Sequence, residues 1–210
     1  TNLIYVNQKV NNRMYRNGSQ RNPANNYMYM TPNMSSENLF PYKDENNNAF
    51  NYEGDFNNPY WNLFENSNQD VTNRVVANLT FNWIILKGLN LKTRINSAIN
   101  KVERFEFNNM GASYDPDGLY REISTSVRNS NYEAILNYTK KFNDFSIVSL
   151  LGVNRFDLRR SGTRQTAISL LQRDIKSLSN GDEFAPVIYL PNNKTINSIF
   201  FFWKFSFEFF

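Results

Sequence analysis

The stretch RVVANLTFNWI, residues 74–84, alternates apolar and polar side chains with a period of two. The apolar members are Val75, Ala77, Leu79, Phe81 and Trp83, and the polar members between them are Asn78, Thr80 and Asn82. This period predicts a β-strand with one apolar and one polar face. The apolar face must meet either the core of a soluble sheet or an apolar medium outside the protein.

Further strands follow this first one, which we place at 72–84. Residues 89–107 continue the alternation after a short connection at 85–88 that contains Gly88, as a hairpin requires. A third strand carries Tyr132, Ala134, Leu136 and Tyr138 on one face, and a tight turn at 141–144 leads to a fourth strand from 145 to about 158. The aromatic end, 201–209, alternates in the same way.

The connections between these strands alternate in length. We expect residues 1–70 to be a loop-rich segment and 71–210 to hold the strands, with long loops near 108–120 and 160–193 and a short helix at 167–178. The tight connections, at 85–88 and 141–144, then lie at one end of the sheet and the long ones at the other. Short turns at one end and long loops at the other are typical of outer-membrane barrels. We therefore predict an all-β fold, a curved antiparallel sheet forming part of a large transmembrane β-barrel, with long extracellular loops.

In this interpretation the two faces of the sheet meet different media. The residues expected to face lipid, on the convex side, are Val75, Leu79, Phe81, Trp83, Leu91, Ile95, Leu136 and Tyr138. Those expected to line the lumen, on the concave side, are Asn78, Thr80, Asn82, Lys92, Arg94 and Asn137. The alternative is a soluble β-sandwich binding module, possibly carbohydrate-binding, built from the same strands. The chain starts and stops abruptly, and we expect it to be a fragment of a longer protein.

The composition excludes several kinds of chemistry. The 210 residues include no Cys and no His, which removes disulfides, thiolate nucleophiles and imidazole ligands or bases. We expect no enzyme activity, no catalytic set, no cofactor and no metal. The net charge is +4, but the basic residues are dispersed and RRSGTR, 159–164, is short. We interpret it as a solvated loop and expect no nucleic-acid partner.

Three segments resemble SusC-like TonB-dependent outer-membrane transporters. They are NPYWNLFENSNQDVTNRVVANLTFNW (58–83), NYEAILNYTKKFNDFSIVSLLGVN (131–154) and KTINSIF (194–200). The chain departs from the family pattern at Asn96 and Ala98, where Gly and Asp are frequent, and beyond Phe200, where aromatic residues replace small and polar ones. The resemblance covers roughly residues 55 to 200.

The resemblance implies a function and a set of partners. Members of the family form a 22-stranded barrel with an N-terminal plug in the outer membrane of Gram-negative cells. They import oligosaccharides, peptides or other large nutrients with a SusD-like surface lipoprotein, energised by TonB. The plug and the TonB contact lie in parts that this chain does not contain.

Aromatic residues in the loops are the candidate ligand contacts. Tyr60 and Trp61 could stack on a sugar ring, or they could anchor a loop or join the interfacial aromatic girdle of a barrel. Tyr27 and Tyr29 present the same alternatives with less support. Asp115 and Asp117 in YDPDG are the notable carboxylate pair among the loops, and their spacing predicts a β-turn rather than a glycosidase or calcium site.

Overall fold

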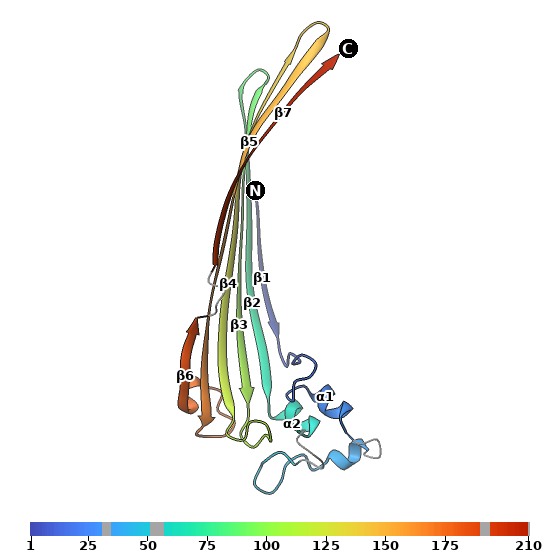
Figure 1. Cartoon of the computed structure of the whole chain (residues 1–210), viewed down its shortest axis with the longest axis vertical. Helices are drawn as coiled ribbons and strands as arrows, with labels where there is room; N and C mark the ends of the chain where they lie inside the picture. The colour runs from blue at the N-terminus through green and yellow to red at the C-terminus, as the bar shows by residue number, and fades with distance from the viewer. Residues whose placement is uncertain (31–34, 51–56, 190–193, 210) are drawn as a thin grey trace.

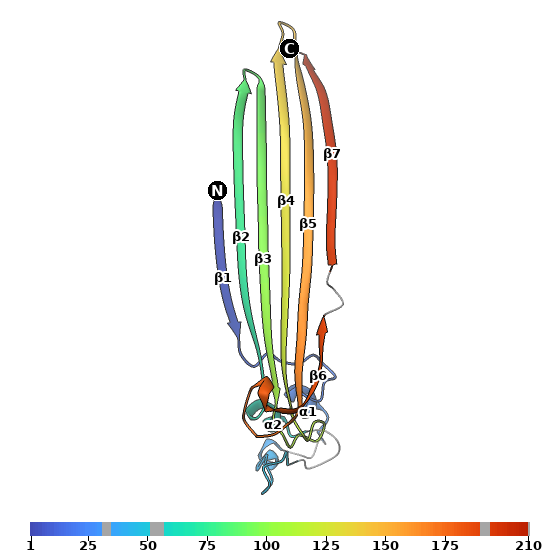
Figure 2. The same ribbon diagram turned by 90° about the vertical axis from the view of Figure 1, so that its left-hand side faces the viewer.

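The computed structural model describes residues 1–30, 35–50, 57–189 and 194–209. It consists of one antiparallel sheet of seven strands with a loop-rich region at one end (Figures 1 and 2). In chain order the strands are β1 (Asn2–Val10), β2 (Ser67–Leu86), β3 (Leu89–Asn108), β4 (Leu119–Lys141), β5 (Phe145–Leu170), β6 (Gly181–Tyr189) and β7 (Lys194–Phe209). The spatial order is β1-β2-β3-β4-β5-β6, and β7 also pairs with β5.

Strands β6 and β7 share one edge of β5. β6 pairs with residues 163–170 and β7 with residues 145–160, so the two strands continue one another along the sheet (Figure 2). The aromatic end is therefore an integral strand. The ring of Phe202 lies over Gly152, its partner in the register, where a Cβ would come within 2.1 Å of the ring. Glycine at 152 makes room for this aromatic side chain.

The alternation of short and long connections is confirmed at three of the four predicted places. β2 and β3 are joined at Lys87 and Gly88, and β4 and β5 at residues 142–144. Gly88 has a φ of +85°, which glycine adopts without strain. The connection at 109–118 lies at the opposite end of the sheet, beside residues 11–30, 35–50 and 57–66 (Figure 1).

The prediction of a long loop at 160–193 with a helix at 167–178 is wrong. β5 runs on to Leu170, β6 begins at Gly181, and between them lies only the 3₁₀ turn η2 (Leu178–Asn180). The RRSGTR segment is therefore a strand and not a loop. It lacks an apolar face and so escapes a pattern search, although its Thr residues favour strands. Its backbone pairs with β4 residue by residue.

The prediction of loops throughout residues 1–70 is also wrong in part. β1 pairs with residues 70–78 of β2, and three short helices follow: α1 (Pro23–Met28), η1 (Ser36–Leu39) and α2 (Pro59–Phe64). α1 and α2 begin alike, because Asn22 and Asn58 cap them through their side chains and proline occupies the next position. β2 and β4 also start earlier than predicted.

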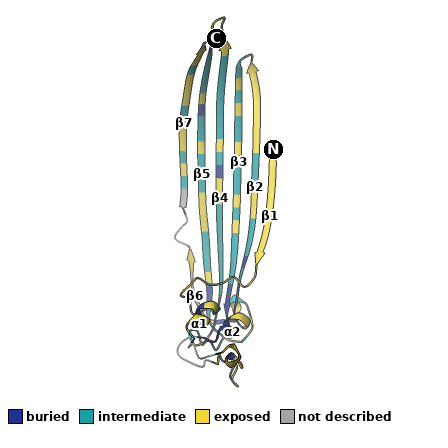
Figure 3. Ribbon diagram, turned by 90° about the vertical axis from the view of Figure 1, so that its right-hand side faces the viewer, coloured by how far each residue is buried: buried dark blue, intermediate teal, exposed yellow. Residues whose placement is uncertain are grey.

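Most of the buried residues lie at one end of the sheet. We call residues 11–30, 35–50, 57–66, 109–118 and 171–180 the cap. Buried residues gather in the cap and at the adjoining strand ends, whereas most of each strand is half-buried or exposed (Figure 3). A small apolar cluster forms where β3, β4 and β5 reach the cap: Phe107, Tyr120, Ala167 and Leu170. Within the described ranges there is a single sheet, so the second layer of a sandwich is missing.

Candidate functional site

The first candidate surface is an apolar belt on one face of the sheet. Because antiparallel partners in register point to the same side, the pairs Leu79–Ile95, Trp83–Leu91 and Leu136–Leu151 share a face. The full belt comprises Val75, Ala77, Leu79, Phe81, Trp83, Leu91, Ile95, Ile99, Tyr132, Ala134, Leu136, Tyr138, Ile147, Leu151, Val153, Ile199, Phe201, Trp203, Phe205 and Phe207. All eight residues predicted to face lipid lie in it. Their contact with lipid stays a prediction.

The belt is exposed, and it occupies only part of the length of each strand. The side chain of Leu79 is 47% exposed, that of Trp83 54% and that of Trp203 82%. In β2 the belt runs from 75 to 83 and in β3 from 91 to 99. A barrel strand crosses the hydrocarbon layer with about 9–11 residues, so both stretches fit that length. β5 has 26 residues in total, so much of the sheet extends beyond the belt.

The opposite face at the same height is mainly polar, although Val76, Ile135, Leu150 and Phe202 also lie on it. It carries all six residues predicted to line the lumen, Asn78, Thr80, Asn82, Lys92, Arg94 and Asn137. The guanidinium Nε of Arg94 donates to the carboxylate of Glu133 on the neighbouring strand at 2.6 Å. Such a face can remain hydrated, whereas a contiguous exposed apolar surface is typical of a site of contact with a partner or a membrane. The register thus confirms the predicted division of the residues into two faces.

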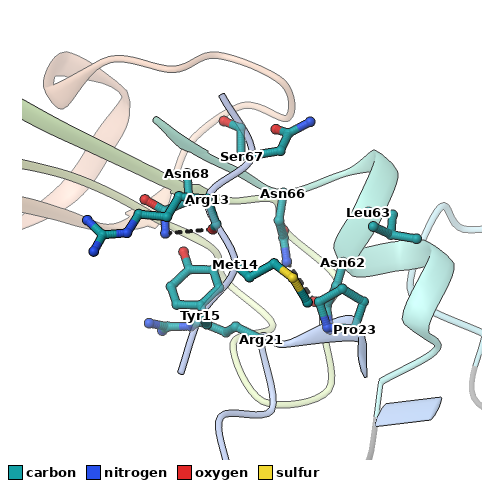
Figure 4. Close-up of a pocket in the computed structure, with 11 residues that line it drawn as sticks. Arg13, Met14, Tyr15, Arg21, Pro23, Asn62, Leu63, Asn66, Ser67 and Asn68 are labelled. Carbon is teal, nitrogen blue, oxygen red and sulfur yellow. Dashed lines mark hydrogen bonds between the residues drawn. The ribbon is translucent and has the colours of Figure 1, made fainter. Parts of the chain in front are cut away.

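One segment of the cap covers the polar face where the strands end. Arg13 forms an ion pair with Asp70, which also accepts from Arg104 at 2.8 Å. Asp70 and Arg104 lie on the same face as Asn78 and Lys92, so residues 11–15 cross over that face. Figure 4 shows the small pocket between this segment and α2, where Asn68 donates to the carbonyl of Arg13 at 3.1 Å.

Asparagine side chains hold the cap together. Asn66 donates to the side-chain oxygen of Asn62 and to the hydroxyl of Tyr114, both at 2.8 Å, and that hydroxyl donates to Asn62 at 2.9 Å. Asn109 donates to Glu65 at 3.0 Å and to Asp174 at 2.7 Å. Each amide both donates and accepts, which allows these buried polar groups to satisfy one another. The cap is consequently a polar rather than an apolar core.

Two tyrosines in the cap have altered acidity. Burial raises the pKa of Tyr15 to about 12, with a further contribution from the Glu106 carboxylate. Burial also raises the pKa of Tyr114, against an opposing effect of the Arg21 guanidinium, which lies 5.6 Å from its ring centroid. Desolvation disfavours the charged phenolate, so both side chains stay neutral far above physiological pH.

The predicted ligand contacts in the cap have different environments. Trp61 is 0% exposed, so its assignment as a ligand contact is wrong: α2 directs it into the cap. Tyr60 is half-buried and its ring packs 4.4 Å from that of Phe40 and 5.9 Å from that of Phe64. Sequence reasoning missed these two partners, which are 51% and 60% exposed. Tyr27 lies within α1 and Tyr29 directly follows it, and both are exposed on the surface of the cap.

The YDPDG segment forms the predicted turn. The amide of Gly118 donates to the carbonyl of Asp115 at 3.1 Å, and the Asp115 carboxylate pairs with Arg21 at 3.3 Å. Among the described residues no group of three or more acidic side chains could hold a metal ion. The carboxylate is engaged in the structure of the cap, which explains its position without a ligand.

The architecture defines a class of protein, a section of β-barrel wall with a structured region at one end. None of the helices in the described part of the chain is long and apolar enough to cross a membrane. No family model and no curated protein matches the chain. Among solved structures it is similar to a chain of the RagAB peptide transporter, with a TM-score of 0.56 and 16% sequence identity. The match covers 77% of this chain and 18% of that one, so this chain spans less than a fifth of its neighbour.

Proposed function

We propose that this chain is part of the wall of a SusC-like, TonB-dependent nutrient importer in the outer membrane of a Gram-negative cell. The observation that carries the proposal is the belt, an exposed apolar band of membrane height backed by a polar face. The sequence resemblance to that family and the fold likeness to a transporter chain support it. In this arrangement the belt meets lipid and Asn78, Lys92 and Arg94 line the lumen.

The cap would then lie outside the cell, over the mouth of the barrel. Its segment 11–15 crosses the polar face, so a nutrient entering the lumen would pass beside this segment. We propose that the nutrient is an oligosaccharide or a peptide and that a SusD-like lipoprotein closes over the same end. Tyr60, Tyr27 and Tyr29 are the candidate ligand contacts, with Phe40 and Phe64 added beside Tyr60.

Transport by the full-length protein tests this function. A strain lacking the gene is compared with strains complemented by wild type or by Tyr60→Ala, using labelled oligosaccharides and peptides with and without active TonB. We expect uptake of one nutrient class to require both the gene and TonB, and Tyr60→Ala to reduce it. Uptake that is independent of the gene for both classes, or recovery of the protein in the soluble fraction, would refute the proposal.

A further inference from the structure

The cap-side edge of the belt carries two arginines side by side. Arg128 of β4 and Arg159 of β5 are direct partners in the antiparallel register. They lie on the same face as Tyr132 and Val153, the belt residues nearest the cap on these strands. The outward surface thus changes from apolar to basic within a few residues, at the level where a lipid headgroup would begin if the belt crosses the membrane.

The charges of these two side chains are not compensated. Like charges directly opposite one another destabilise a strand pair. Two nearby basic groups on the same face have partners: Lys101 binds Glu103 at 2.6 Å and Arg155 binds Asp157 at 3.2 Å. Over the part of the chain that the structure describes, neither Arg128 nor Arg159 forms an ion pair or a side-chain hydrogen bond. Both are exposed, and an anion between them would relieve the repulsion.

The two arginines border a groove with a volume of about 60 Å³. Ser130, Tyr132 and Asp157 complete its lining. Ser130 is buried, and its hydroxyl is 3.2 Å from that of Ser97. The Asp157 carboxylate is occupied by Arg155, so the free charge around the groove is positive. Guanidinium groups offer forked donors that match the oxygens of a phosphate.

We propose that this groove binds the phosphate of an anionic lipid headgroup in the leaflet next to the cap. The proposal rests on the proposed function, because it requires the belt to lie in the membrane. A nutrient in the lumen could not reach the groove, since Arg128 and Arg159 point away from the polar face. Basic side chains at a membrane surface attract anionic lipids, and the apolar belt beside them would hold the acyl chains.

Lipid binding by the full-length protein in detergent tests the inference. Native mass spectrometry would measure the affinity for bisphosphorylated lipid A, for its dephosphorylated form and for inorganic phosphate. In the Arg128→Gln/Arg159→Gln variant, the affinity for the bisphosphorylated lipid should fall by about tenfold or more, as expected for loss of charge-assisted hydrogen bonds. Arg160→Gln is the matched control, because Arg160 is exposed on the same strand but points to the other face.

Several outcomes would overturn the inference. Equal binding of bisphosphorylated lipid by wild type and the double variant would do so, as would equal wild-type affinity for the two lipids. Inorganic phosphate competing as well as the lipid would assign the groove to a free anion, and a protein that co-purifies only with the wild type would assign it to a protein partner. If the double variant reaches the outer membrane and supports normal uptake but binds the lipid as the wild type does, this inference is wrong and the proposed function stands. Absence of the protein from the outer membrane would reject the proposed function as well.

Discussion

Trp61 lies in the cap and Trp83 in the belt, and the two regions differ in how far they bury their side chains. Trp61 is 0% exposed inside the cap, whereas Trp83 is 54% exposed in the belt. The interior of the cap consists largely of asparagine side chains, which form hydrogen bonds with neighbouring side chains and with the loop backbone. In the described part of the chain no second layer packs on the belt, and its apolar side chains remain exposed. The same chain therefore folds against itself at one end and exposes apolar side chains at the other.

The largest loss of stability should come from a cavity in the core of the cap. Trp61→Ala removes a fully buried aromatic side chain, and such changes cost about 3–5 kcal/mol. In the full-length protein we expect rapid hydrogen exchange throughout the cap, with the strand amides of the belt region still protected. Trp83→Ala is the control and should leave exchange in the cap unchanged. Equal loss of protection in both variants would mean that the two regions unfold as one unit.

Charge in the belt should have the next largest effect. Leu79→Arg places a guanidinium on the apolar face, at a cost of about 2–4 kcal/mol near the bilayer midplane. Asn78→Arg changes the adjacent residue on the polar face and should cost much less. Unfolding by guanidinium chloride of the full-length barrel in lipid bilayers measures both. Similar losses for the two variants would contradict the assignment of the faces.

A smaller loss is expected when one cap amide is removed. Asn109 is 2% exposed, and its side chain donates to Glu65 and Asp174 and accepts from the amide of Met110. Asn109→Ala leaves two carboxylates without these donors, which should cost about 1–3 kcal/mol. Asn82→Ala, on the exposed polar face, should change stability by no more than about 0.5 kcal/mol. Protease sensitivity of the cap, measured against denaturant, separates the two outcomes.

The smallest effect at neutral pH concerns Tyr15. Burial raises its pKa from the ordinary 10.0 to about 12, so the unfolded cap releases this proton at lower pH than the folded cap. The stability of the cap should be independent of this group below pH 10.0 and should fall as the pH rises from there to about 12. A difference absorbance titration of wild type against Tyr15→Phe should show phenolate forming near pH 12. Ionisation near pH 10 would show that the side chain is in water.

The sequence predicts the belt well because a sheet with one apolar and one polar face must alternate along each strand. Leu79 and Asn78 could be assigned to opposite faces from the period alone, and the register confirms it. Residues 159–164 of β5 do not alternate in this way, because the Ser, Thr and Arg side chains there form no apolar face. This segment is a strand because its backbone pairs with β4. Local pattern therefore failed where long-range hydrogen bonding decides the structure.

The cap was harder to predict for a different reason. Asn58 before Pro59 signals a helix start, but Asn is also common in turns, so the sequence predicts a loop where α2 forms. The burial of Trp61 and the stacking of Tyr60 on Phe64 depend on which face α2 turns inward. The Asn62–Asn66–Tyr114 contacts join segments far apart in the chain, and no local pattern specifies such pairs.

Site-directed spin labelling of strand β2 tests the central claim most directly. These 210 residues contain no native cysteine. In the full-length protein in bilayers, with any cysteine elsewhere replaced by serine, single cysteines at positions 69 to 84 can each carry a nitroxide. From 75 to 83, odd positions should be accessible to oxygen and even positions to a water-soluble nickel chelate. At 69, 71 and 73, beyond the belt, the odd positions should become accessible to the chelate instead. A profile without a period of two, or with oxygen access at Asn78 and Asn82, would contradict a lipid-facing belt.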